Sequence, residues 1–176
     1  MAIINHISPN FDDRPANEEV DVLVMHYTGM QNAKEALERL CDATAKVSSH
    51  YLVFEDGTIY CLVDEDKRAW HAGISCWHGR SSLNDTSIGI EIVNPGHEFG
   101  YRKFPQEQMD AVLALSQDIL SRYNIIPNNI VGHSDIATNR KQDPGELFDW
   151  KFLADNGVGL WPVSYTHLRA HETSHH

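Results

Sequence analysis

The chain has 176 residues, a length that suits one globular domain built around a single core. Its formal net charge of −11 argues against a nucleic-acid partner, because binding phosphates requires a basic surface. No apolar run approaches the roughly 20 residues that a transmembrane helix needs. The three cysteines form neither a close pair nor a metal-binding spacing, a pattern typical of a reducing compartment rather than of a disulfide scaffold.

The two ends of the chain differ from the rest. Residues 1–20 have neither the basic nor the apolar region of a secretion signal, so we expect a cytoplasmic protein. A leader removed from the native gene would instead place it in the periplasm. Residues 163–176 are dense in His and Thr and have no apolar period, which is typical of a vector-derived tail or tag. We therefore expect a single domain over residues 1–162 and assign no site to the four tail histidines.

The first half of the chain alternates apolar runs with turn signals. Asp21–Tyr27 is rich in valine and predicts a strand buried on both faces. Gln31–Cys41 places its apolar residues on one stripe and predicts a helix. His50–Glu55 and Thr58–Val63 predict a β-hairpin, because an Asp-Gly dipeptide separates them. Ala69–Leu83 is rich in Gly, Ser, Trp and His without a period, so we expect a long ordered loop there.

The second half supplies two more strands and the clearest helix. Ser87–Val93 predicts a strand with three isoleucines on one face. Pro105–Tyr123 predicts a helix that begins at proline and carries an apolar face. Asn129–His133 predicts a third buried strand, and Asp149–Asp155 predicts a short closing helix. Strands that alternate with helices indicate a single α/β domain whose central sheet is covered on both faces.

Two of the predicted strands end in histidine, at His26 and His133. Ligands of open α/β sheets gather beyond the carboxyl ends of the strands, so we expect the two imidazoles to lie close together. Asp143 follows ten residues after His133, and a loop of that length returns its carboxylate to the same metal. Two imidazoles and one carboxylate form a catalytic zinc site whose fourth position holds water. The alternatives are hydrogen-bonded structural histidines and a turn residue in Asp-Pro-Gly.

Two charged residues have both a catalytic and a structural interpretation. Glu91 lies inside an apolar strand, where burial is costly for an unpaired carboxylate. It is either a general base whose pKa burial raises, or a structural glutamate in a salt bridge or on a solvent-facing side. Lys141 lies two residues before Asp143, so both side chains leave an extended segment on the same face. It either stabilises an oxyanion or is an exposed surface lysine.

Six segments, in the same order along the chain, resemble the zinc-dependent N-acetylmuramoyl-L-alanine amidases of the type-2, T7-lysozyme-like fold. They span residues 22–161 and read VLVMHYTG, VSSHYLVFEDGTIYCLV, AWHAGISCW, LNDTSIGIEIVNPG, VGHSDIA and RKQDPG followed by LFDW. The resemblance implies a mixed central sheet and one zinc ion per chain. It also implies roles for five residues: the zinc ligands His26, His133 and Asp143, the acid/base Glu91 and the transition-state cation Lys141.

The resemblance further implies a substrate groove along the segment AWHAGISCW. His71, Trp77 and Asn84 lie in or near this segment and are candidates for contact with sugar or stem peptide. Structural roles within an ordered loop are the alternative for all three. His50 belongs to the SSHY segment, and we expect it to be a packed core histidine.

The function that the resemblance implies is hydrolysis of the amide bond between N-acetylmuramic acid, or its 1,6-anhydro form, and the L-alanine of the stem peptide. The substrate would be a muropeptide or peptidoglycan fragment, processed in cell-wall turnover and recycling by a monomeric bacterial enzyme. Three alternatives stay open: a non-catalytic peptidoglycan-binding receptor on the same fold, a lytic amidase that attacks intact walls, and a purely structural zinc site. The structural zinc is disfavoured because three ligands leave one coordination position open.

Overall fold

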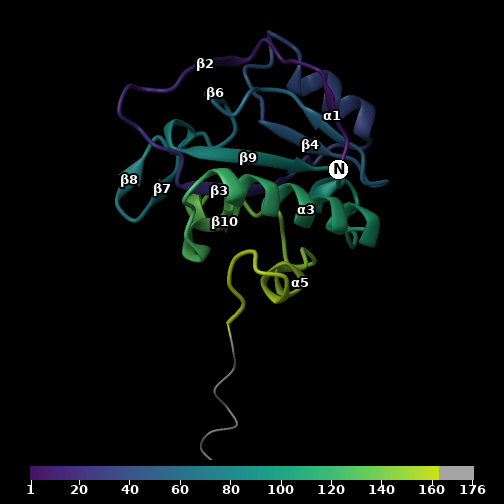
Figure 1. The fold of residues 1–176 in the computed structure, drawn as a ribbon. Coiled ribbons are helices and arrows are strands. Elements are labelled where there is room, and N and C mark those ends of the chain that lie inside the picture. The colour runs from purple at the N-terminus through teal and green to yellow at the C-terminus, as the bar shows by residue number, and fades with distance from the viewer. Residues whose placement is uncertain (163–176) are drawn as a thin grey trace, which may run out of the picture.

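The computed structural model describes residues 1–162 and centres on a six-stranded sheet (Figure 1). Strands β4 and β5 are antiparallel, whereas the other neighbouring pairs are parallel, so the sheet is mixed as the resemblance implies. The strands lie in the order β1 (Ile3–Asn5), β5 (Ile59–Cys61), β4 (Tyr51–Val53), β9 (Ser87–Ile92), β3 (Val22–Tyr27) and β10 (Ile130–Gly132).

The side chains of the central strands β9 and β3 alternate between the main core and the opposite face of the sheet. The three isoleucines of β9 point to one face and join Leu23 and Met25 of β3 in the main core. Helices α3 (Gln106–Arg122) and α5 (Trp150–Asp155) contribute buried side chains to the same core and lie on one side of the sheet in Figure 1. The alternate residues of β9, which include Glu91, face the opposite way.

The opposite face of the sheet is covered by α1 (Ala33–Leu40), α4 (His133–Ile136) and the 3₁₀ helix η1 (Leu83–Asp85). Helix α1 begins after Asn32, whose side chain accepts a hydrogen bond from the backbone N–H of Glu35. Buried side chains of α4 and η1 pack on the valines of β3, and α1 packs on β4. Helices therefore cover both faces of one domain, which confirms the fold class predicted from the sequence.

Several short elements have no counterpart in the sequence prediction. The segment Ala69–Leu83, expected to be a loop, contains a small antiparallel hairpin. These strands have only two or three residues, too few to show an alternating pattern. The unpredicted elements are β1, β2 (Phe11–Asp13), β6 (Lys67–Ala69), β7 (Cys76–Trp77), β8 (Arg80–Ser81), α2 (Gly96–Phe99), α4 and the 3₁₀ helices η1 and η2 (Pro127–Asn129).

The expected tail at residues 163–176 lies outside the described residues. Within residues 1–162, each helix is too short or too polar to cross a membrane.

Candidate metal centre

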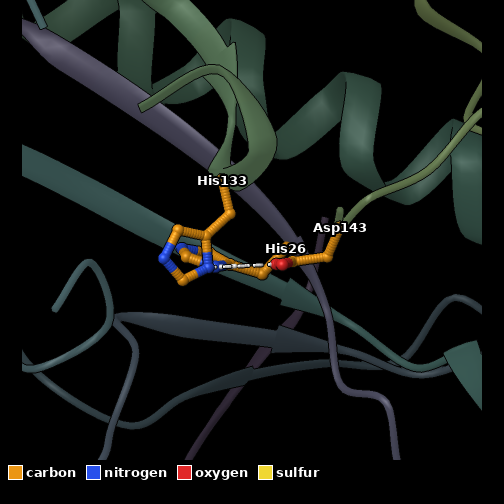
Figure 2. A group of neighbouring side chains, drawn as sticks. All are labelled: His26, His133 and Asp143. Atoms are coloured by element: carbon orange, nitrogen blue, oxygen red, sulfur yellow. Dashed lines mark hydrogen bonds and ion pairs between the residues drawn. The ribbon is translucent and has the colours of Figure 1, made fainter. Parts of the chain in front are cut away.

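Neighbouring strands bring His26 and His133 together. Strands β3 and β10 are parallel, and Gly132 pairs with Met25. The next residue along each strand direction is therefore a histidine: His26 near the end of β3, and His133 at the start of α4. Asp143 reaches the same point from the loop that follows α4, and Figure 2 shows the three side chains converging.

The three side chains have the spacing of zinc ligands. The Nδ1 atoms of His26 and His133 are 3.0 Å apart, and each lies 3.2 Å from Oδ2 of Asp143. Ligand atoms of a tetrahedral zinc site are about 3.3 Å apart, given metal–ligand distances of roughly 2.0–2.1 Å. All three residues are buried. Two imidazoles and one carboxylate thus fit a zinc ion and leave one position for a further ligand.

The protonation states of these groups suit metal binding. Burial, with a further contribution from His133, lowers the pKa of His26 to about 4, so its imidazole is neutral at pH 7. Burial raises the pKa of Asp143, but hydrogen bonds with His133 and His26 outweigh it and hold that pKa below its ordinary value. A neutral imidazole and an ionised carboxylate both have lone pairs free to bind a cation.

Glu91 lies beside this cluster because it is the register partner of His26 on the adjacent strand β9. Its Oε2 is buried and has no hydrogen-bond partner among the described residues. Burial raises the pKa of Glu91 well above its ordinary value, the charge of Asp143 raises it further, and Lys141 opposes both. A carboxyl group with a raised pKa and a free oxygen is suited to exchange protons with a molecule in the site.

Lys141 lines the solvent-accessible cavity beside the same site. It is exposed, and its ammonium group forms no ion pair with another residue in the range 1–162. A cavity of about 440 Å³ passes over the cluster, and its lining includes Tyr27, Arg39, Glu91, His97, Lys141 and Asp143. The cavity therefore brings two of the three ligand side chains, those of His133 and Asp143, to one surface with Glu91 and Lys141.

Comparison with protein families tests the expectation drawn from the sequence. The model described as N-acetylmuramoyl-L-alanine amidase matches residues 16–146, well over half of the chain. The chain belongs to the N-acetylmuramoyl-L-alanine amidase family. The N-acetylmuramoyl-L-alanine amidase AmiD of Escherichia coli K12 is 45% identical over 159 residues, which are 84% of this chain and 56% of AmiD. This chain thus spans little more than half the length of that relative.

Other members of the amidase family match over more of their length. The 1,6-anhydro-N-acetylmuramyl-L-alanine amidase AmpD of Enterobacter cloacae is 35% identical over 160 residues, covering 81% of this chain and 83% of AmpD. A crystal structure of AmpD has a TM-score of 0.78 at 33% identity, with 88% of this chain and 93% of AmpD covered. E. coli AmiD in complex with anhydro-N-acetylmuramic acid-L-Ala-D-γ-Glu-L-Lys has a TM-score of 0.76 at 39% identity, with 88% and 68% covered.

The three residues expected to contact substrate form side-chain hydrogen bonds within the protein in this member of the amidase family. Both ring nitrogens of His71 are engaged inside the protein, at His26 and Ser87, although the residue borders the cavity. The side-chain oxygen of Asn84 accepts two backbone N–H groups, and Trp77 donates its indole N–H to Asn129. Within the described chain, neither Asn84 nor Trp77 lines the cavity. This geometry favours the alternative, structural roles.

His50 and Arg140 complete the surroundings of the site. His50 is fully buried, as expected for a core histidine, and its Nδ1 accepts the backbone N–H of Gly89. Arg140 donates hydrogen bonds to the backbone carbonyls of Ala72 and Ile74 and so ties the ligand loop to the segment that contains His71. The sequence offered no signal for Arg140, because its partners are backbone oxygens rather than residues of recognisable chemistry.

Proposed function

We propose that this chain hydrolyses the amide bond between N-acetylmuramic acid, or its 1,6-anhydro form, and the L-alanine of a muropeptide. The observation that carries the proposal is the convergence of three ligand atoms, 3.0–3.2 Å apart, beside the buried and unpartnered oxygen of Glu91. His26, His133 and Asp143 would hold one zinc ion. A purely structural ion would have no use for a free carboxyl group and an open cavity next to it.

The relatives support this choice of substrate. AmpD is named for action on 1,6-anhydro-N-acetylmuramyl-L-alanine, and the solved AmiD complex contains anhydro-N-acetylmuramic acid joined to a peptide that begins with L-alanine. Both names refer to an anhydro sugar, so we assign this chain to the recycling of such fragments rather than to attack on intact walls. The described cysteines are free thiols, which fits the predicted cytoplasmic location. That location and the predicted monomeric state remain predictions.

The chemistry divides between the metal and two side chains. A bound zinc ion would polarise the scissile carbonyl and acidify the attacking water. Glu91 takes a proton from that water at a carboxylate oxygen and later delivers it to the departing amine of L-alanine. The Lys141 ammonium stabilises the negative charge that develops on the carbonyl oxygen. Burial suits Glu91 to this exchange, because it raises the pKa and so lets the carboxyl group hold a proton more readily than an exposed glutamate does.

The decisive experiment incubates zinc-replete protein with purified anhydro and reduced muropeptides and follows the products by mass spectrometry. We expect a free stem peptide and a peptide-free sugar to appear in equal amounts. Binding of the muropeptide without release of peptide would favour the receptor alternative instead. Absence of both binding and release would contradict the proposal.

Replacement of Glu91 tests its role separately from the metal. Glu91→Gln keeps the size of the side chain but cannot take a proton, so we expect turnover to fall by about 10²-fold or more. Zinc content, measured by atomic absorption, should match that of the unaltered protein. An unchanged rate would remove Glu91 from the mechanism and leave the metal assignment intact.

A further inference from the structure

Two adjacent residues, His71 and Ala72, supply one hydrogen-bond acceptor to each histidine ligand. The Nε2 of His26 lies 2.9 Å from Nδ1 of His71, and the Nε2 of His133 lies 2.9 Å from the backbone oxygen of Ala72. A histidine that binds a metal through Nδ1 carries its proton on Nε2. Both ligands therefore donate their remaining N–H to the same short segment, which orients both rings.

The two acceptors differ in kind. The carbonyl of Ala72 always accepts, whereas Nδ1 of His71 accepts only if the proton of that ring is on Nε2. Ser87 can accept the Nε2–H of this tautomer, because its buried Oγ is 3.0 Å from Nε2 of His71. With His26 bound through Nδ1, the proton order along the chain is determined: His26 donates to His71, and His71 donates to Ser87.

The ring of His71 is held firmly in this position. It lies directly on the backbone of β9, since a Cβ atom added at Gly89 would fall 2.5 Å from its Cγ. The rings of His26 and His50 pack edge-on against it, with centroids 5.0 and 5.9 Å away. The backbone N–H groups of His71 and Ala72 donate to the side-chain oxygen of Asn84 at 3.1 and 2.8 Å.

We propose that His71 is a positioning residue for the metal centre: it accepts the Nε2–H of His26 and so keeps that ring in the tautomer that binds zinc, while Ser87 accepts the Nε2–H of His71. The inference rests on the proposed zinc site and assigns His71 and Asn84 to that site rather than to the substrate. Loss of an acceptor behind a metal-bound histidine typically lowers metal affinity about 10- to 100-fold.

The test is a zinc titration of the full chain in competition with a chromophoric chelator. His71→Leu removes the acceptor, and we expect affinity to fall about 10- to 100-fold. His71→Gln offers an amide oxygen in its place and should retain most of the affinity. Ser87→Ala removes only the second hydrogen bond and should give a smaller loss. Ser116→Ala removes a buried hydroxyl from helix α3, which packs on the other face of the sheet, so it should leave affinity unchanged.

A second readout is the N–H proton of His26, observed by NMR in protein loaded with Co²⁺. We expect a slowly exchanging Nε2–H resonance in the unaltered protein and in His71→Gln, and its loss in His71→Leu. Unchanged affinity and an unchanged resonance in folded His71→Leu would overturn the inference. Should that variant not fold, the same two results for Ser87→Ala would overturn it.

The proposed zinc site itself is tested with Asp143→Ala, which lacks one of the three ligands and reports any zinc bound elsewhere on the chain. If the unaltered protein binds no more zinc than Asp143→Ala, the metal assignment fails. If it binds more zinc than Asp143→Ala but with the same affinity as His71→Leu, only the role of His71 fails.

Discussion

His50 is a buried histidine whose two ring nitrogens have opposite roles. Its Nδ1 accepts the backbone N–H of Gly89, and its Nε2–H donates to the backbone oxygen of Lys67. Protonation of Nδ1 would place its new N–H against the N–H of Gly89. The guanidinium of Arg14, 3.1 Å from Nε2, also disfavours a positive charge on the ring. Burial is the largest cause that lowers the pKa of His50, to about 4.

This lowered pKa predicts a loss of stability in acid. Between pH 6.5 and about 4 the unfolded chain binds a proton at His50 that the folded protein does not, so the free energy of unfolding falls as pH falls. His50→Gln removes this contribution. We expect the difference in unfolding free energy between pH 7 and pH 5 to shrink by about 2 kcal/mol in that variant. Urea unfolding of metal-free protein at the two pH values measures it, and equal differences would contradict the assignment.

The role proposed for Lys141 predicts two effects, one on the reaction rate and one on the pKa of Glu91. Lys141→Ala should lower kcat/KM by about 10²-fold, the usual effect of removing one group that stabilises an oxyanion. Because the lysine lowers the pKa of Glu91, its removal should also move the acidic limb of the pH–rate profile to higher pH. Lys151→Ala, which removes an exposed cation of α5, is the charge control and should change neither quantity. A reduced rate with an unchanged pH–rate profile would show that Lys141 does not influence the pKa of Glu91.

Some residues of the candidate site could be predicted from the sequence, whereas others could not. His26 and His133 were predictable because each follows an apolar strand, and Asp143 because it lies one loop away. Glu91 stood out as a carboxylate in an isoleucine strand. The arrangement of His71 was not predictable, since it depends on the bare backbone of Gly89 and on Ser87, neither of which has chemistry that spacing alone reveals.

Strand β9 carries the site because its two faces have different side chains. Three isoleucines face the core, whereas Ser87, Gly89 and Glu91 face the metal centre. The middle position must be glycine, because the ring of His71 occupies the space of its side chain. One strand thus places a hydroxyl beside His71, makes room for its ring and carries the proposed acid/base residue.

Gly89→Ala should therefore disturb the protein out of proportion to one methyl group. The added Cβ would lie 2.5 Å from Cγ of His71, so the ring must move. We expect a loss of about 1–3 kcal/mol in the free energy of unfolding, as for other overpacked cores. A double-mutant cycle with His71→Ala checks the cause, because the clash disappears when the ring is absent. Additive effects of the two substitutions would show that the strain arises elsewhere.

The longer helices and strands could be predicted from the sequence, whereas most of the short ones could not. The six-residue strands β3 and β9 and the helix α3 were evident from valine and isoleucine runs and from an apolar stripe. The hairpin of β4 and β5 was evident from Asp-Gly. Strands β1, β2 and β6 to β8 have two or three residues each, and pairing rather than their own pattern makes them strands. The partners of β1, β2 and β6 are distant in sequence, whereas β7 and β8 pair with each other.

For the whole molecule, the metal centre joins three separate parts of the chain. His26 belongs to β3, His133 to the start of α4, and Asp143 to the loop beyond it. The first two lie 107 residues apart in sequence. A ligand that binds this folded arrangement and not the unfolded chain must stabilise the fold by mass action.

Zinc should thus raise the thermal midpoint of unfolding. At a free concentration of 100 times Kd, the expected gain is about 2.7 kcal/mol. For a domain of this size that corresponds to roughly 5–10 °C. Calorimetry with zinc and with excess chelator measures the shift, and Asp143→Ala should show little of it. An equal shift in Asp143→Ala would mean that the three side chains do not form the stabilising site.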